Sequence, residues 1–483
     1  MNSRRFTCGC HRKHPGGMML DKVKIKQGWV TGKPGKLPGT MAFLGIPYAR
    51  APVGELRYKA PQPPVSWEGI RDCSEFQPSC IQPQRGEQFP VSEDCLYLNV
   101  YTPARFSDER LPVMFWIYGG GFNGGRADTP ILDGDEINRR GVVLVTINYR
   151  CGVMGFCALS GWENTVNAGI LDQIAALQWV RENIADFGGD PNCVTIFGQS
   201  AGGVSVRMLL TSPLSQGLFQ RAIIQSGGGL NEADPIRPKH EFMDLCQRAL
   251  DHLGWTEADL IQRDAMEITE SMNAAARECS DTFEVGFFQP FVDEYSILDV
   301  PGVLIAKGQY QAVPIICGTV AGDSWMFSRK VRNQLTDVAH FRGLSYAASQ
   351  AWAQLNVQSG RTPIYTYYMD RKQPVAPNPH WRNGPPPYGA DTPHTSDVAY
   401  VFGHRETALL DVELSRQMCS YWCNFAKHGD PNGEGLEYWP IDVPMHFGDH
   451  GCKAEYIILT SQEQRTVDHT IAHPGLLTTL EGF

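Results

Sequence analysis

The stretch that decides the fold is V-T-I-F-G-Q-S-A-G-G at residues 194–203. Residues 194–197 form an apolar run of the kind that fills a strand buried on both faces. Residues 201–210 are compatible with a helix. The pattern G-x-S-x-G between such a strand and a helix predicts a sharp turn that presents Ser200 as a nucleophile. Gly198 and Gly202 suit this turn, because a strained backbone leaves little room for side chains beside it. The competing interpretation is an ordinary Gly/Ser turn, and the flanking elements argue against it.

Outward from this turn, apolar runs alternate with helical patterns. Strands are expected at Val113–Tyr118, Val142–Tyr149, Val194–Gly198, Ala222–Gln225, Val313–Thr319, Ile364–Tyr368 and Glu455–Leu459. Apolar side chains recur every three or four residues over Gly169–Phe187 and from Glu413 to Lys427, which predicts helices there. Alternation of this kind indicates an α/β fold with a large, mostly parallel central sheet flanked by helices. We expect residues 1–20 to form a tail without fixed structure and residues 21–483 to form a single domain.

A second glycine cluster follows the expected strand Val113–Tyr118, where the chain continues as G-G-G-F. Glycines directly after a buried strand let backbone N–H groups approach a substrate closely, as in the oxyanion hole of an acyl-transfer site. The predicted donors are the N–H groups of Gly120, Gly121 and Ala201. A loop without a catalytic role is the alternative. The flanks do not fit a phosphate-binding loop.

The acid and the base of such a site are expected after the serine in the chain, with the histidine last. Asp323 follows the expected strand Val313–Thr319. On position alone, Asp293 and Glu294 compete with it. Among the 13 histidines, His394 is the best candidate, because it lies in a polar loop after a proline-rich segment. In these roles His394 takes the serine proton, and Asp323 fixes the tautomer of the imidazole.

Composition narrows the class of partner. The 42 basic and 52 acidic residues give a net charge of −10, which argues against nucleic acid and anionic membranes as partners. Apolar stretches are much shorter than the roughly 20 residues needed to span a bilayer. The basic segment Met1–Gly17 has no apolar run behind it, so we expect a cytoplasmic protein. No cofactor and no metal are expected. Near the N-terminus, Cys8 and Cys10 lie close to His11 and His14, and a frayed tail is favoured there over a metal site.

Together these motifs resemble the type-B carboxylesterase family, the cholinesterase-like branch of the α/β-hydrolases. The likeness runs from about Val23 to the C-terminal region. It includes F-L-G-I-P-Y-A at residues 43–49, S-E-D-C-L-Y-L-N at residues 92–99 and F-G-Q-S-A-G-G at residues 197–203. The resemblance implies an acyl-serine esterase acting on small carboxylic esters. It assigns the catalytic positions to Ser200, His394 and Asp323, although most members carry Glu in place of this aspartate.

The resemblance has further implications. Ser226 matches a supporting serine, and Arg57 and Glu93 match positions that usually form an ion pair. Cys80 and Cys95 match a disulfide of secreted members. Because a cytoplasmic location is expected, we predict reduced thiols at these two positions.

Two departures bear on the substrate. Cholinesterases carry Glu beside the nucleophile, where this chain has Gln199, and they carry a choline-binding Trp between the two matched cysteines, where this chain has none. Both losses remove cation affinity and favour a general, bacterial-type carboxylesterase. An apolar pocket is predicted, with core packing as the alternative for each residue. Its candidates are Phe122, Phe287, Phe288, Trp325 and Phe327.

Other functions remain as alternatives. Some relatives of this fold are non-catalytic binding or adhesion proteins, but these usually lack a triad member, and this chain retains all three. An acyltransferase or a thioesterase would use the same three residues with a different acceptor or substrate.

Overall fold

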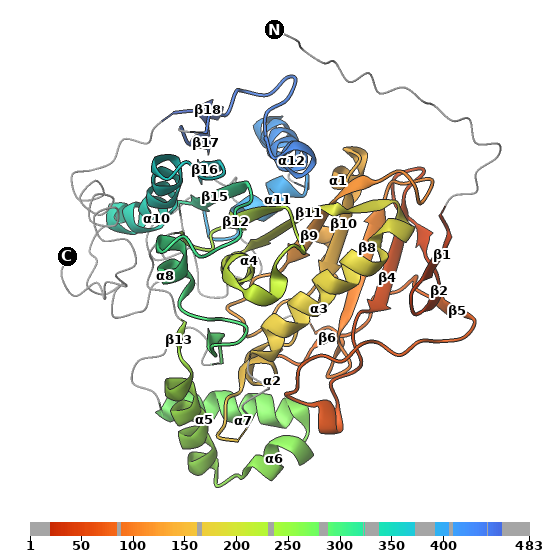
Figure 1. Cartoon of the computed structure of the whole chain (residues 1–483), viewed down its shortest axis with the longest axis vertical. Helices are drawn as coiled ribbons and strands as arrows, with labels where there is room; N and C mark the ends of the chain where they lie inside the picture. The colour runs from red at the N-terminus through yellow and green to blue at the C-terminus, as the bar shows by residue number, and fades with distance from the viewer. Residues whose placement is uncertain are drawn as a thin grey trace.

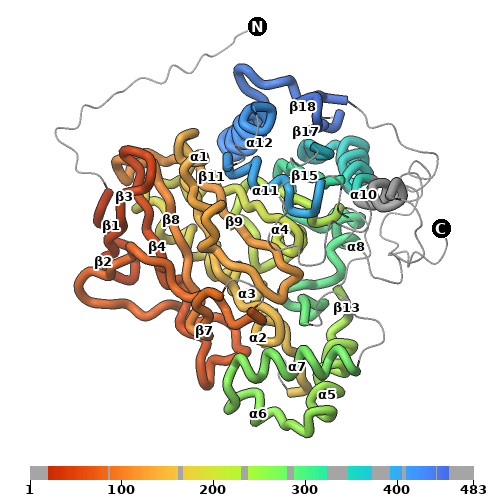
Figure 2. Tube along the Cα trace, turned by 180° about the vertical axis from the view of Figure 1, so that it is seen from behind, coloured from red at the N-terminus to blue at the C-terminus, as the bar shows by residue number. Residues whose placement is uncertain are grey.

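The computed structural model describes residues 20–84, 88–161, 167–229, 236–279, 288–321, 323, 338–371, 392–404, 409–441 and 443–455. Within these residues the chain builds one large twisted sheet with helices on both faces, and α5–α7 gather at one end of the molecule (Figures 1 and 2). In the described residues no helix combines the length and the apolar character needed to cross a membrane. The expected tail at residues 1–20 lies almost entirely outside the described residues, and the division into a tail and one domain stays a prediction.

The large sheet has eleven strands in the described residues, in the order β18-β17-β16-β15-β12-β11-β9-β10-β8-β4-β3. The seven strands from β10 to β17 in this order run parallel, and antiparallel strands flank them at both edges. The strands are β3 Lys33–Pro34, β4 Met41–Pro47, β8 Tyr97–Thr102, β9 Leu111–Ile117, β10 Val143–Ile147, β11 Gly189–Gln199, β12 Arg221–Gln225, β15 Ile315–Val320, β16 Ile364–Met369, β17 Met445–Gly448 and β18 Gly451–Ala454.

Helices connect the strands. They are α1 Asp135–Arg139, α2 Gly152–Phe156, α3 Ala168–Asn183, α4 Ala201–Thr211, α5 Lys239–Leu253, α6 Glu257–Gln262, α7 Ala265–Cys279, α8 Pro301–Ala306, α10 Val338–Gln358, α11 Ser396–Val401 and α12 Leu409–His428, with 3₁₀ turns η1 Gly54–Leu56, η2 Pro130–Leu132, η3 Ile184–Phe187 and η4 Pro213–Ser215. The described residues also form three small sheets. They comprise β1 Lys22–Ile25 with β2 Gly28–Thr31 and β5 Ile70–Asp72, β6 Ser79–Cys80 with β7 Val91–Ser92, and β13 Arg237–Pro238 with β14 Phe291–Val292.

Successive side chains along each central strand point to opposite faces of the sheet and pack into two hydrophobic cores, one on each face. In β9, Val113 and Phe115 belong to the core that packs under α3 and α4, whereas Met114 and Trp116 belong to the core under α11 and α12. Because both faces are covered, nearly every residue of such a strand is buried. The continuous apolar runs in the sequence are therefore the signature of this double burial.

The predicted mostly parallel sheet is confirmed, and the differences lie at element ends. The helix predicted over residues 169–187 ends at Asn183 and continues as the 3₁₀ turn η3, which Gly188 closes with a left-handed φ of 80°. The helix predicted from Glu413 starts earlier, at Leu409. The strand predicted from Glu455 is wrong at that residue, because β18 ends at Ala454; residues 456–459 lie outside the described residues.

Candidate active site

Ser200 lies at the sharp turn between β11 and α4. Its φ of 58° and ψ of −127° are a strained combination for a non-glycine residue. The turn is held because the Ser200 N–H donates to the Gln225 carbonyl at 2.9 Å, and the Ser200 carbonyl accepts from the Val204 N–H at 2.9 Å. A Cβ atom on Gly202 would lie 2.0 Å from the Ile117 carbonyl oxygen. The glycine is therefore required for α4 to pass this close to β9.

The glycine loop after β9 lies directly against the nucleophile. A Cβ atom on Gly119 would lie 2.9 Å from Ser200 Cβ, and Gly120 and Gly121 have φ angles of 124° and 60°. Ala201 is the first residue of α4, so its N–H has no partner within the helix. The structure thus brings the predicted donor segments together beside Ser200. Their role as oxyanion donors stays a prediction.

Asp323 and His394 form a hydrogen-bonded pair. His394 Nδ1 lies 2.6 Å from Asp323 Oδ1, and the aspartate side chain is 2% exposed. The other carboxylate oxygen, Oδ2, accepts the Val320 N–H at 3.0 Å and is bonded by the Thr319 hydroxyl. These contacts at the end of β15 leave the first oxygen of the carboxylate directed at the imidazole. Sequence reasoning found the aspartate and missed Thr319, because a threonine inside a buried strand carries no distinguishing signal.

The hydrogen bond to Asp323 determines the tautomer of His394 and influences its pKa. Because an ionised carboxylate only accepts hydrogen bonds, Nδ1 carries the proton and Nε2 is the acceptor in the neutral ring. Burial lowers the pKa of His394, but the hydrogen bond that His394 donates to Asp323 and the negative charges of Asp323 and Asp397 outweigh it, and the pKa is raised above its usual value. The partner of His394 Nε2 is the side-chain nitrogen of Gln199, at 3.3 Å. The acceptor nitrogen thus lies next to the residue that precedes Ser200.

A buried polar cluster supports the loop that carries His394. The Asp397 carboxylate accepts from Gln225 Nε2 at 3.0 Å and from the Tyr367 hydroxyl at 2.7 Å. The Trp422 indole N–H donates to Gln225 Oε1 at 3.2 Å, which ties the cluster to α12. Burial raises the pKa of Asp397 more than the hydrogen bonds from Gln225 and Tyr367 lower it. These partners could not be predicted from the sequence, because Gln225 and Tyr367 lie within apolar patterns that indicate only buried strands.

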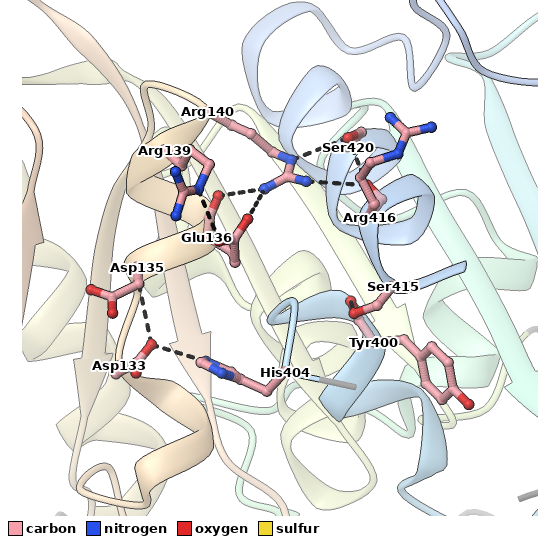
Figure 3. A network of polar contacts seen from close by, with 10 residues as sticks. All are labelled: Asp133, Asp135, Glu136, Arg139, Arg140, Tyr400, His404, Ser415, Arg416 and Ser420. Atoms are coloured by element: carbon pink, nitrogen blue, oxygen red, sulfur yellow. Dashed lines mark hydrogen bonds and ion pairs between the residues drawn. The ribbon is translucent and has the colours of Figure 1, made fainter. Parts of the chain in front are cut away.

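The segment that follows His394 is anchored at its far end as well. His404 Nε2 lies 2.9 Å from Asp133 Oδ1, in the segment that joins the glycine loop to α1 (Figure 3). The Ser415 hydroxyl of α12 donates to the Tyr400 carbonyl of α11 at 3.1 Å. These two contacts hold the C-terminal end of the α11 segment, and the hydrogen bonds of Asp397 hold the end next to His394.

The competing acids lie elsewhere. Asp293 accepts hydrogen bonds from Asn167 Nδ2 at 2.9 Å and from the Ser296 hydroxyl at 2.7 Å, in the loop after β14. Its neighbour Glu294 is exposed. Of the three carboxylates considered, the structure pairs only Asp323 with His394.

The predicted ion pair between Arg57 and Glu93 is confirmed. Two guanidinium nitrogens meet the two carboxylate oxygens, each at 2.6 Å. Arg57 Nη1 also donates to the carbonyls of Leu260, Ile261 and Arg263 at 2.9–3.0 Å. One buried side chain therefore joins the N-terminal part of the chain to the end of α6.

The prediction of reduced thiols at Cys80 and Cys95 is wrong, because the structure joins them as a disulfide with a Cα–Cα distance of 5.0 Å. Pairing of β6 with β7 places Cys80 opposite Ser92, close to Cys95 in the chain. The prediction rested on a cellular compartment, whereas the pairing depends on local geometry. Ser226, the other matched position, is buried with a φ of 50°, and its N–H donates to the Gly318 carbonyl of β15 at 2.8 Å.

Two of the predicted pocket residues are described. Phe122 packs edge to face on Phe156 with ring centroids 5.6 Å apart, and Phe288 is fully buried. Both belong to the main core, which agrees with the packing alternative. A pocket role for them stays a prediction. The other candidates, Phe287, Trp325 and Phe327, lie outside the described residues, as do Cys8, Cys10, His11 and His14.

A parallel sheet that carries a serine at a strained strand–helix turn, with an Asp–His pair beside it, defines an α/β-hydrolase. Comparison with known proteins gives the family. The model of the carboxylesterase family matches residues 20–346 and 335–446. The chain is 34% identical to para-nitrobenzyl esterase of Bacillus subtilis over 467 residues, covering 85% of this chain and 92% of that protein. It is 33% identical to fumonisin B1 esterase of Sphingopyxis macrogoltabida over 446 residues, covering 82% of this chain and 81% of that one.

Solved structures agree. A PNB esterase structure superposes with a TM-score of 0.78 at 30% identity, covering 92% of this chain and 99% of that one. A Geobacillus stearothermophilus carboxylesterase gives a TM-score of 0.71 at 28% identity over the same shares. The chain belongs to the carboxylesterase family and is a carboxylic-ester hydrolase.

Proposed function

We propose that the enzyme hydrolyses small carboxylic esters through a covalent acyl-Ser200 intermediate. The observation that carries this proposal is the His394–Asp323 pair, joined at 2.6 Å, whose second ring nitrogen lies 3.3 Å from the side chain of Gln199, in the turn that bears Ser200. An imidazole held in one tautomer by a buried carboxylate is the base that activates a serine hydroxyl.

In the first half-reaction His394 Nε2 accepts the Ser200 proton while the oxygen attacks the ester carbonyl. The N–H groups of Gly120, Gly121 and Ala201 bind the oxyanion of the tetrahedral intermediate, and each such donor contributes roughly 3–4 kcal/mol to lowering the barrier. The intermediate collapses, and the leaving alcohol departs with the proton from His394. In the second half-reaction a water molecule gives a proton to His394 and attacks the acyl group. The bond from the acyl carbon to the Ser200 oxygen then breaks, His394 returns the proton to that oxygen, and the carboxylic acid is released.

Gln199 occupies the position from which Ser200 must donate its proton to His394 Nε2 in this reaction. Its amide nitrogen lies 3.3 Å from His394 Nε2, where the Ser200 hydroxyl has to donate. Catalytic hydrogen bonds of such sites often form fully only when the substrate is bound. We infer that Ser200 replaces Gln199 as the hydrogen-bond donor when an ester enters.

The names of the relatives supply the first substrates to test. Para-nitrobenzyl and para-nitrophenyl esters of graded acyl length should be hydrolysed with an initial burst of alcohol when deacylation is slow. A fluorophosphonate probe should label Ser200, and Ser200→Ala should lose both the labelling and the turnover. Unchanged turnover in the Ser200→Ala variant would overturn the proposal. Gln199 next to the nucleophile, in place of an acid, predicts no preference for cationic alcohols.

A further inference from the structure

A cluster of side chains that could bind a metal lies at the edge of the large sheet, on residues that the candidate active site does not use. The antiparallel strands β17 and β18 form a hairpin in which Gly448 pairs with Gly451 across the turn. The sequence H-F-G-D-H at residues 446–450 places one histidine in β17 and the other in the turn, and Glu455 follows β18 directly. The hairpin thereby brings two imidazoles and a carboxylate together.

The donor atoms are spaced as a metal ion requires. Glu455 Oε1 lies 3.0 Å from His446 Nδ1 and 3.2 Å from His450 Nε2, and one ligand atom from each of the three residues can be chosen with all of them within 4.8 Å of one another. In a tetrahedral zinc site with bonds of about 2.0–2.2 Å, neighbouring ligand atoms lie about 3.4 Å apart. Small side-chain rotations would therefore open the cluster enough to place an ion between the three atoms.

The ring nitrogen of His446 that faces away from Glu455 has a carboxylate partner, as the outer nitrogen of a metal-binding histidine usually does. Its Nε2 lies 2.7 Å from Asp370 Oδ1, at the end of the neighbouring strand β16. Metal-binding histidines almost always donate their other ring N–H to a carboxylate or carbonyl, which orients the ring and makes the ligand more basic. In the neutral ring whose Nε2 donates to Asp370, the lone pair of Nδ1 points toward the Glu455 carboxylate. Either a proton on Nδ1 or a cation between these two acceptors removes that conflict.

The backbone fixes the frame of the cluster. The Asp370 N–H donates to the Phe447 carbonyl at 3.1 Å, and the Glu455 N–H donates to the Pro444 carbonyl at 3.1 Å. The His446 side chain is 14% exposed, and Glu455 is 44% exposed, so the cluster is open to ions from solvent. Lys453 is the cross-strand partner of His446 and is a positive charge that opposes binding on this face.

We propose that His446, His450 and Glu455 bind one zinc ion, with Asp370 orienting His446 and water completing a tetrahedral site. Two imidazoles and one carboxylate are a common zinc donor set, and imidazole ligands favour zinc over magnesium or calcium. The ion would join the edge hairpin to the end of β16. It takes no part in the ester hydrolysis proposed above, so the two proposals are tested separately.

The test uses the full chain with any histidine tag removed and bound metal stripped by dialysis. Titration with zinc chloride in a calorimeter should show saturable binding, and the number of zinc ions bound per chain should fall by one in His450→Ala and in Glu455→Gln. Asp370→Asn should weaken this site about 10–100-fold. Cobalt(II) in place of zinc should give the strong visible absorption of a tetrahedral site, and the same variants should lose it.

His252→Ala is the matched control. His252 Nε2 lies 3.1 Å from Glu278 Oε2 on the surface. This pair offers one imidazole and one carboxylate, whereas the proposed zinc site offers two imidazoles and one carboxylate. This variant should bind zinc as the unaltered chain does. Thermal unfolding followed by circular dichroism checks that every variant is folded. Absence of saturable zinc binding to the unaltered chain, or an unchanged number of bound ions in His450→Ala and Glu455→Gln, would overturn the proposal.

Discussion

Gly119→Ala tests whether the glycine loop must lie where the structure places it. The added Cβ atom would lie 2.5 Å from the Gln199 carbonyl oxygen and 2.9 Å from Ser200 Cβ. Nonbonded carbon atoms prefer about 3.5–4.0 Å, so the loop must withdraw from the nucleophile by roughly 1 Å. The proposed donors Gly120 and Gly121 follow directly in the chain and must move with it.

The size of the effect follows from this displacement. A misplacement of about 1 Å in an active site can cost about 10²-fold in rate. Loss of one oxyanion donor costs about 10²–10³-fold in kcat, or about 2.7–4 kcal/mol of barrier lowering. We expect Gly119→Ala to lower kcat by about 10²–10³-fold, with a much smaller change in KM, since the donors act mainly in the transition state. Initial rates over a range of p-nitrophenyl acetate concentrations give both constants.

The control is Gly189→Ala, at the opposite end of β11. Its Cβ atom would meet Ile184 Cγ1 at 2.8 Å and Val113 Cγ2 at 2.9 Å, a comparable crowding away from the site. This variant should unfold at a lower temperature and keep its kcat per folded molecule. If Gly119→Ala is folded and retains the kcat of the unaltered enzyme, the proposed position of the donors is wrong.

Three further outcomes are expected. Because the pKa of His394 is raised above 6.5 and only the neutral ring accepts a proton, kcat/KM should fall as the pH drops through this pKa, and a midpoint below 6.5 in the pH–rate profile would contradict the pairing. Arg57→Met should lower the free energy of unfolding by about 3–5 kcal/mol in urea titrations, because it leaves the Glu93 carboxylate unpaired. A loss of stability no larger than that caused by replacing an exposed arginine with methionine would refute this prediction. Reduction of the Cys80–Cys95 disulfide, which closes a loop with a sequence separation of 15 residues, should cost about 3 kcal/mol of stability, seen as a lower unfolding temperature with reductant.

The parts of the site that depend on neighbours in the chain were predictable from the sequence. The turn at Ser200 was predicted because a buried strand, a glycine-flanked serine and a helix follow one another directly. The glycine loop at Gly119 was predicted for the same reason. In both cases the backbone geometry depends on residues within a few positions.

The parts of the site that depend on contacts between residues far apart in the chain were harder to predict from the sequence. His394 lies 71 residues beyond Asp323, and its choice among 13 histidines rested on its position in a polar loop after a proline-rich segment and on the family resemblance. The supporting residues Gln225 and Tyr367 belong to strands whose patterns predict only burial. Their hydrogen bonds to Asp397 depend on the packing of β12, β16 and α11, which a single sequence does not show.

The order of the site residues along the chain also has a consequence for synthesis. Gly120, Gly121, Ser200 and Ala201 all leave the ribosome before His394 and the α12 residues that hold its segment. A growing chain therefore carries Ser200 for part of translation without His394, the proposed base. Under the mechanism proposed above, ribosome-bound fragments that end before residue 394 should therefore be inert toward cellular esters.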